Sequence, residues 1–242
     1  MYKRQELYIN KGNNAEGIPT FIEDASSYGL DLPNYSTQAS FFDYDRDGDL
    51  DMFLINSGIE PTALPTEKLL SIKSEYTSDK LFRNDDGMYK DVSEASGIVN
   101  NSLGFGLGIA VGDLNNDQWP DIVIGQDYSE KDHLYINQKD GTFKEVIKEA
   151  TNHISNFSMG NDIGDINNDG WLDFISVDMV STNNYDLKTS MSGMDPKRFQ
   201  DMVDKGLHHQ YMFNTLQLNN GKMLDGGVPA FSDIAQLAGV SN

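Results

Sequence analysis

Three nine-residue stretches of this chain carry Asp or Asn at alternate positions. They are DYDRDGDLD at residues 43–51, DLNNDQWPD at residues 113–121 and DINNDGWLD at residues 165–173. Alternate side chains of such a loop turn towards one point, and Ca²⁺ is bound by oxygen ligands that include a backbone carbonyl at position 7. The three stretches therefore predict up to three Ca²⁺ sites.

Each loop would supply side chains from positions 1, 3, 5 and 9 and the backbone carbonyl of position 7. The predicted ligands are Asp43, Asp45, Asp47, the carbonyl of Asp49, and Asp51 in loop one; Asp113, Asn115, Asp117, the carbonyl of Trp119, and Asp121 in loop two; and Asp165, Asn167, Asp169, the carbonyl of Trp171, and Asp173 in loop three. Position 6 is Gly48 in loop one and Gly170 in loop three. Loop two has Gln118 there, where a positive φ would be strained.

An EF-hand and a metal-free turn are the two alternatives to this kind of site. An EF-hand needs flanking helices and a glutamate at position 12, and none of the three loops has that glutamate. Asx-rich turns without any metal would also place Asp and Asn close together. This second alternative stays open for any single loop and is less favoured by three loops in the same register.

The acidic loops belong to a repeat whose basic unit is about 52 residues, the distance from Asp113 to Asp165. A second marker recurs as LYIN at 7–10, LFRN at 81–84, LYIN at 134–137 and LQLN at 216–219. In each unit an alternating stretch leads into the loop, a short apolar run follows, and the marker precedes a turn. Four short strands per unit, joined up and down, are typical of β-propeller blades. We therefore predict an all-β fold, a β-propeller of four-stranded blades.

The chain holds about three and a half such blades, because residues 7–30 supply only the outer half of one. Propellers close with roughly four to eight blades. Residues 1–242 are therefore expected to be a partial propeller, with the remaining blades in the same parent chain. Residues 1–5, MYKRQ, resemble a translated transposon adapter, which would place the natural N-terminus upstream. Glycines predict close packing of the innermost strands, at Gly108, Gly112, Gly160 and Gly164.

Two long insertions, 57–80 and 179–214, both follow the second strand of a unit. Up-and-down strands place that connection on the face opposite the acidic loops, so we expect a partner to bind there. The second insertion contains a predicted helix with Asp195 as N-cap, Pro196 in the first turn and a stop at Gly206. Its apolar face is formed by Phe199, Met202 and Val203.

The composition excludes several classes of function. The formal net charge is −20, which disfavours nucleic acid and anionic membrane surfaces as partners and favours cations. The chain has no cysteine, and no apolar run is long enough for membrane insertion. No signal peptide is visible in this sequence.

Several further residues could carry chemistry, but simpler roles account for them. Metal or base chemistry at His208 and His209 is less favoured than ordinary polar surface. Asp127, Glu130 and Asp132 could pair as acid and base, although close carboxylates arise by chance in so acidic a chain. Met191 and Met194 are expected to pack, as are the two loop tryptophans. The motifs of serine hydrolases, zinc proteases and phosphate-binding loops are absent from the sequence.

The segments VGDLNNDQWPDIVIG and IGDINNDGWLDFISVD resemble FG-GAP repeats, also called VCBS repeats, the blades of the integrin α-subunit propeller. The segment MSGMDPKRFQDMVDKGLHHQYMFNTLQLNNG resembles bacterial secreted proteins that carry an ASPIC/UnbV domain and are related to cartilage acidic protein. The resemblance implies a seven-bladed ring, an extracellular or cell-envelope location, and Ca²⁺ as a structural ion.

These observations lead to one main hypothesis and two alternatives. The main one is a calcium-binding extracellular β-propeller that acts as a ligand-binding or adhesion module for a glycan or a protein. A propeller-based carbohydrate-active enzyme, a lyase or a hydrolase, is the alternative, and it would need convergent acid, base or arginine groups at the axial mouth. A structural spacer is the third, but the two insertions argue against it.

Overall fold

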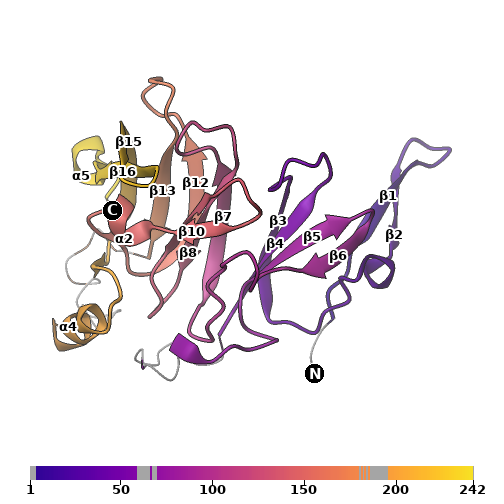
Figure 1. The fold of residues 1–242 in the computed structure, drawn as a ribbon, viewed down its shortest axis with the longest axis horizontal. Helices are drawn as coiled ribbons and strands as arrows, with labels where there is room; N and C mark the ends of the chain where they lie inside the picture. The colour runs from indigo at the N-terminus through magenta and orange to yellow at the C-terminus, as the bar shows by residue number, and fades with distance from the viewer. Residues whose placement is uncertain are drawn as a thin grey trace.

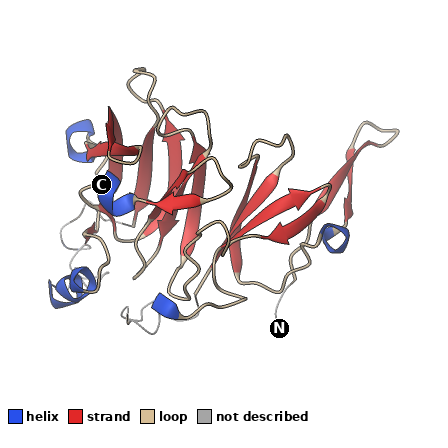
Figure 2. Cartoon of the chain, in the orientation of Figure 1, coloured by secondary structure: helices blue, strands red, loops and turns tan. Residues whose placement is uncertain are grey.

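The computed structural model describes residues 4–58, 66, 70–179, 181, 183, 185 and 196–241. Within them, strands dominate and helices are few and short, as Figure 2 shows. Three four-stranded sheets and the two-stranded sheet of β1 and β2, all antiparallel, stand side by side (Figure 1). The all-β prediction is confirmed. Three residues singled out above, Met191, Met194 and Asp195, lie outside the described residues.

Each four-stranded sheet is a meander, with its strands adjacent in chain order. Sheet one consists of β3 (Ser36–Phe42), β4 (Asp51–Asn56), β5 (Lys80–Asp85) and β6 (Met88–Asp91). Sheet two consists of β7 (Gly106–Gly112), β8 (Asp121–Gln126), β9 (His133–Asn137) and β10 (Phe143–Glu145). Sheet three consists of β12 (Ser158–Gly164), β13 (Asp173–Asp178), β15 (Thr215–Leu224) and β16 (Val228–Asp233).

The two-stranded sheet, β1 (Tyr8–Asn13) with β2 (Pro19–Glu23), repeats the outer half of the other three. In every unit the residue after the last strand donates its N–H to the carbonyl of the marker leucine. The pairs are Asp24 to Leu7 at 2.9 Å, Val92 to Leu81 at 2.9 Å, Val146 to Leu134 at 2.8 Å and Ile234 to Leu216 at 2.9 Å. This shared bond shows that β1 and β2 correspond to the third and fourth strands of a unit.

The core lies between the sheets, because β4 and β8, the second strands of sheets one and two, are buried on both faces. On β4, Phe53 and Ile55 pack towards sheet two. Met52 and Leu54 pack towards residues that flank β1 and β2, among them Leu7 and Ala25. Strands buried on both faces are nearly continuous apolar runs, which is why DMFLIN and DIVIG do not alternate. Ile124 of β8 is fully buried between sheets one and two, so its truncation to Ala would cost about 2–5 kcal/mol.

Close packing of the innermost strands is found for two of the four predicted glycines. A Cβ on Gly108 would lie 2.8 Å from the backbone nitrogen of Asn161 in β12, and one on Gly112 would lie 3.0 Å from Leu172. At Gly160 the nearest atom would be 3.7 Å away, and at Gly164 nothing lies within 4 Å. The prediction is therefore wrong for these last two positions, because no further sheet packs on sheet three in the described part of the chain.

Short helices and one small parallel pairing complete the fold. They are η1 (Ala25–Tyr28), α2 (Ile147–Ala150), α4 (Pro196–Asp204), α5 (Ala235–Ala238), and β11 (Ile154–Ser155) paired with β14 (Gln210–Tyr211). Helix α4 begins at Pro196 and is followed by Gly206 with φ 89°, as predicted. Met202 is buried, and Phe199 stacks on Tyr211 of β14. Among the described helices, none has the length and apolar character needed to cross a membrane.

The acidic loops and the insertions lie at opposite ends of the sheets. The loops join β3 to β4, β7 to β8 and β12 to β13, whereas the insertions join β4 to β5 and β13 to β15. Because neighbouring strands are antiparallel, these two kinds of connection fall on opposite faces, and α4 lies on the face away from the loops (Figure 1).

Candidate metal centres

The three acidic loops share one backbone conformation. Positions 4 and 6 have positive φ in every loop: Arg46 62° and Gly48 98°, Asn116 56° and Gln118 71°, Asn168 59° and Gly170 88°. The positive φ predicted for Gln118 is confirmed. The positive φ at position 4 was not predicted, although the Asn-Asn pair in loops two and three fits a left-handed residue there.

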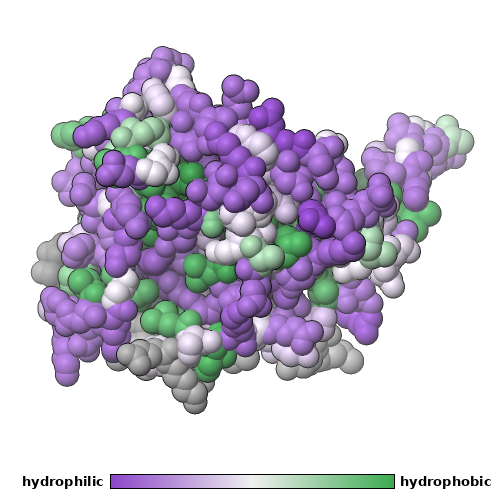
Figure 3. Space-filling view, viewed as in Figure 1, coloured by the Kyte–Doolittle hydropathy of each residue, from purple (hydrophilic) through white to green (hydrophobic). Residues whose placement is uncertain are grey.

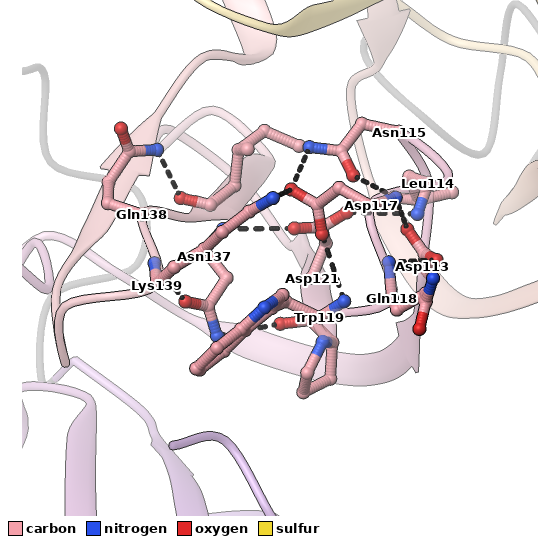
Figure 4. A network of polar contacts seen from close by, with 12 residues as sticks. Asp113, Leu114, Asn115, Asp117, Gln118, Trp119, Asp121, Asn137, Gln138 and Lys139 are labelled. Carbon is pink, nitrogen blue, oxygen red and sulfur yellow. Dashed lines mark hydrogen bonds and ion pairs between the residues drawn. The ribbon is translucent and has the colours of Figure 1, made fainter. Parts of the chain in front are cut away.

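Backbone N–H groups orient the carboxylates at positions 1 and 5. In loop two, Asp113 accepts from the N–H of Asp117 at 2.9 Å and from that of Gln118 at 2.7 Å (Figure 4). Asp117 accepts from the N–H of Trp119 at 2.9 Å. Loops one and three make the same three bonds at 2.8–3.1 Å. The loops are therefore ordered by their own hydrogen bonds.

The aspartate at position 9 is fully buried in every loop and joins the loop to the third strand of its sheet. Asp121 accepts from the N–H of Leu114 at 2.9 Å and from that of Asn137 at 2.9 Å. Asp51 and Asp173 accept the corresponding pairs of N–H groups. Burial raises the pKa of Asp51 to about 6 and that of Asp121 to about 7, because a buried carboxylate loses its hydration.

Loop one brings three carboxylates together. Single oxygens of Asp43, Asp45 and Asp51 lie within 4.8 Å of one another. One oxygen of Asp45 is buried and has no hydrogen-bond partner. Burial, followed by the charges of Asp47 and Asp43, raises the pKa of Asp45. An unpartnered carboxylate oxygen beside other acids is the environment that a hard cation would relieve, so the residues of loop one fit Ca²⁺.

In loops two and three, the carboxylates at position 5 have other side chains as partners. The Asn115 amide donates to Asp117 at 2.9 Å, and the Asn167 amide donates to Asp169 at 2.9 Å. The ammonium of Lys139 also lies 3.2 Å from Asp117. Across the described residues, a close group of three acidic or histidine side chains is found in loop one alone. The predicted ligands of each of these two loops thus lie together. Some of their carboxylate oxygens, however, already accept a hydrogen bond from Asn or pair with Lys139.

Neighbouring loops are linked through the asparagine that ends each marker, a contact that the sequence analysis missed. The Asn137 amide donates to the carbonyl of Tyr44 in loop one at 2.8 Å, and the Asn219 amide donates to that of Leu114 in loop two at 2.8 Å. The sequence does contain a signal for this contact, because all four markers end in Asn. Two surface contacts also bridge adjacent loops: Arg46 over the Trp119 ring at 5.4 Å, and Asn116 to the Gly170 carbonyl at 3.0 Å.

The two loop tryptophans are packing residues, as expected. Trp119 is half-buried beneath Arg46, and Trp171 lies against the turn after Asn219, where a Cβ on Gly221 would come within 3.0 Å of the indole nitrogen.

On the opposite face, the predicted acid–base group serves the fold. Asp127, Glu130 and Asp132 are 4%, 2% and 1% exposed. Asp132 accepts from the N–H of Gln126 at 2.8 Å and from the Ser158 hydroxyl at 2.9 Å. Glu130 accepts from the Asn101 amide at 2.7 Å and from the N–H of Lys131 at 3.1 Å. A general acid or base must reach its substrate, so these buried carboxyls do not support the acid–base hypothesis.

Asp132 belongs to a clamp that recurs in all three sheets. The residue before the third strand accepts from the N–H of the last residue of the second strand: Asp79 from Asn56 at 2.9 Å, Asp132 from Gln126 at 2.8 Å, and Asn214 from Asp178 at 2.7 Å. Burial raises the pKa of both Asp79 and Asp132 to about 7. In the third sheet, the neutral side-chain amide of Asn214 accepts the corresponding hydrogen bond.

The expectation of a polar surface is wrong for His208. Its side chain is 7% exposed and its Nε2 lies 3.1 Å from the Thr151 hydroxyl. Burial lowers its pKa to about 4, so it is neutral at physiological pH. His209 is exposed and its ring stacks on Phe199 of α4. The two histidines thus help to seat the second insertion on the sheets.

A family model described as an FG-GAP-like repeat matches residues 113–176. This chain carries an FG-GAP-like repeat. The matched segment begins at the first residue of loop two and ends within β13, so it includes both loop two and loop three. The four-stranded antiparallel sheets agree with the blades of FG-GAP propellers. A search of curated proteins finds no match to the chain.

Proposed function

We propose that this chain is a calcium-binding segment of an extracellular β-propeller and acts as a ligand-binding or adhesion module. The observation that carries the proposal is the carboxylate cluster of loop one, with its unpartnered Asp45 oxygen. The repeated loop geometry supports further sites in loops two and three. The sheets would be blades of a seven-bladed ring in a secreted or cell-envelope protein of the ASPIC/UnbV-carrying group, as the sequence resemblance implies.

Calcium should stabilise the folded chain by mass action, because only the folded loops collect the ligands. Extracellular modules bind Ca²⁺ with dissociation constants of about 10⁻⁴ to 10⁻³ M. At tenfold excess over such a constant, each site adds about 1.4 kcal/mol, which raises the melting temperature by roughly 3–6 °C. Thermal unfolding in a chelator, in Ca²⁺ and in Mg²⁺ measures the effect. An unchanged melting curve in Ca²⁺ would refute the proposal.

A matched pair of variants ties this effect to loop one. Asp45→Asn keeps the size of the side chain but removes one charge from the cluster, so it should reduce the Ca²⁺-dependent rise in melting temperature. Asp225→Asn removes the same charge from an exposed turn and should leave that rise unchanged. Equal effects of the two variants would mean that Ca²⁺ acts through the overall charge of the chain.

A cleft that charged and polar residues surround supports the proposal of ligand binding on the face opposite the loops. It has a volume of about 630 Å³ and lies where the first insertion meets the residues after β6. Its charged lining residues are Lys73, Glu75, Asp79, Lys80, Asp91 and Glu94. Two ion pairs cross it, Lys73 with Glu94 at 2.8 Å and Lys80 with Asp91 at 2.6 Å. Donors and acceptors of both charges suit a hydroxyl-rich ligand, so we favour a glycan over a protein.

A glycan array, probed with the intact chain in Ca²⁺ and in chelator, tests this choice. Glu94→Gln and Lys73→Ala alter exposed cleft residues and should weaken binding, whereas Lys11→Ala, on the exposed β1–β2 hairpin, should not. Absence of glycan binding under both conditions would overturn the glycan assignment. The calcium experiment can still succeed in that case, so the two parts are tested separately.

A further inference from the structure

Three aromatic side chains form a row across sheets two and three, on the face opposite the acidic loops. Phe105 directly precedes β7, Tyr128 follows β8, and Phe157 directly precedes β12. The Tyr128 ring is nearly perpendicular to both neighbours, with its centroid 5.4 Å from that of Phe105 and 6.0 Å from that of Phe157. All three residues are half-buried, so each keeps part of its surface exposed. Perpendicular rings form a corner in which one small group can contact two aromatic rings.

The middle residue of this aromatic row has a backbone conformation that bulky residues seldom adopt. Tyr128 has a φ of 68°, a left-handed value at which glycine or asparagine is usual. Its neighbour Asp127 fixes the turn: the Asp127 N–H donates to the Phe105 carbonyl at 2.9 Å, and the carboxylate accepts from the Tyr128 N–H at 2.9 Å. Strained residues that their surroundings fix in this way cluster at functional sites.

Two carboxylates adjoin the aromatic row, and we call them the acid pair. Asp127 precedes Tyr128 in the chain. One oxygen of Asp178 accepts from the N–H groups of Asn156 and Phe157, both at 3.1 Å. The other oxygen of Asp178 is buried and has no hydrogen-bond partner in the described part of the chain. Burial and, to a smaller degree, the charge of Asp178 raise the pKa of Asp127 to about 6, so the two carboxylates interact.

The acid pair has no counterion in the described part of the chain, because none of the ion pairs there includes Asp127 or Asp178. A charge in a partly buried place acts over several ångströms without contact, since little water screens it. A cation is also attracted by the face of an aromatic ring. A cation against the aromatic row would therefore be stabilised by the rings and by the acid pair together, and the net charge of −20 favours its approach.

We propose that the aromatic row binds a quaternary ammonium group, such as the trimethylammonium group of choline, and that the acid pair holds it by charge. Burial of the carboxylate oxygens favours this cation over a primary ammonium, which would give up hydrogen bonds to water without reaching new acceptors. On the face drawn in Figure 3, hydrophobic residues form only small patches within a hydrophilic surface. A row of three half-buried rings is also small, so it suits a small ligand better than a protein partner.

This site lies apart from those of the proposed function. It shares no residue with the acidic loops or with the cleft described above, so it does not depend on calcium or on a glycan. Failure of either proposal would leave the other intact.

Calorimetric titration of the full chain with choline tests the proposal. The control ligand is the neutral carbon analogue of choline, in which a quaternary carbon replaces the nitrogen. We expect saturable binding of choline that is about tenfold or more tighter than that of the analogue. Equal binding of the two ligands would overturn the proposal. No binding of choline at any concentration that leaves the chain folded would overturn it as well.

Variants separate the contribution of the rings from that of the charges. Tyr128→Phe keeps the ring and should bind choline about tenfold more tightly than Tyr128→Leu, which keeps only the apolar bulk. Asp127→Asn and Asp178→Asn should weaken the binding of choline but not that of its neutral analogue. Asp225→Asn, at an exposed turn, should leave choline binding unchanged. Thermal unfolding shows which variants are folded. Equal affinity of the folded Phe and Leu variants for choline would refute the contact with the ring.

Vesicles of phosphatidylcholine distinguish two sources of the same cation. Co-sedimentation that free choline displaces would assign the site to a lipid headgroup. Choline binding without co-sedimentation would assign it to a soluble ligand. Both outcomes support the site, whereas co-sedimentation that choline does not displace would count against binding through the quaternary ammonium group.

Discussion

Replacement of Asp132 by Asn tests the physical basis of the recurring clamp. The Asp132 carboxyl is 1% exposed and accepts from Gln126 N–H at 2.8 Å and from the Ser158 hydroxyl at 2.9 Å. The third sheet holds the same place with Asn214, whose side-chain oxygen accepts from Asp178 N–H at 2.7 Å. Asp132→Asn should therefore preserve the bond to Gln126, and it removes a group that titrates.

The size and sign of the effect follow from the pKa. Burial raises the pKa of Asp132 from 3.8 to about 7, so the folded chain holds a proton that the unfolded chain releases in this range. The wild type therefore loses stability as pH rises from about 4 to about 7, at about 1.4 kcal/mol per pH unit from this group, and the loss is complete above pH 7. The Asn side chain does not titrate in this range, so it adds no dependence of stability on pH. Between pH 5 and pH 8 the stability of Asp132→Asn relative to wild type should thus rise by about 3 kcal/mol as an upper value.

Urea unfolding of both proteins at pH 5 and pH 8 measures this difference. All other titrating groups are common to the two proteins and cancel in the comparison, apart from direct coupling to Asp132. Asp225→Asn, which removes an exposed carboxylate, is the matched control and should show a difference near zero at both pH values. If Asp132→Asn and wild type differ by the same amount at pH 5 and pH 8, the buried carboxyl is not held protonated and the reasoning is wrong.

Three further predictions concern the acidic loops. Asn137→Ala should lower the free energy of unfolding by about 2 kcal/mol in urea, because it leaves the Tyr44 carbonyl without its donor; Asn220→Ala, at an exposed position next to a marker, should change it by less than about 0.5 kcal/mol. Gln118→Gly should leave stability unchanged or raise it slightly, whereas Gly170→Gln should lower it by about 1 kcal/mol, since both positions have positive φ. Lys139→Ala should raise the Ca²⁺ affinity of loop two in a calorimetric titration, because it removes the ammonium beside Asp117; an unchanged affinity would contradict competition by Lys139.

The strands and loops were predictable because each is specified by residues close together in the sequence. An alternating stretch, an acidic loop with its turn residue and a short apolar run are all local patterns, and they recur with enough regularity to reveal the unit. The half sheet at residues 8–23 could be predicted for the same reason, since its marker and final turn match those of the complete sheets. Carboxylates at alternate positions were sufficient to predict the cluster of loop one.

Other features depend on contacts between segments far apart in the chain. The burial of His208 depends on Thr151, 57 residues earlier, after the second insertion folds back on α2. The amide of Asn137 reaches a carbonyl 93 residues away, at Tyr44. No local periodicity encodes either contact. The clamp formed by Asp79 and Asp132 was also hidden, because in sequence these residues resemble ordinary loop acids.

The hydrogen bonds of the acidic loops indicate what a bound cation would contribute. Position 1 is fixed by two N–H groups of its own loop, and position 9 by the loop and by the third strand. In loops one and two, the position 2 carbonyl is also fixed by the next sheet. These bonds are all made between groups of the protein, and a cation would add ligand bonds to them. Its contribution would be to offset the repulsion among Asp43, Asp45 and Asp51. Preorganised ligands lower the entropic cost of binding, whereas loops two and three must first release Asn or Lys partners. Loop one should therefore fill first in a Ca²⁺ titration, and Asp45→Asn should remove the tightest step while leaving the weaker steps in place.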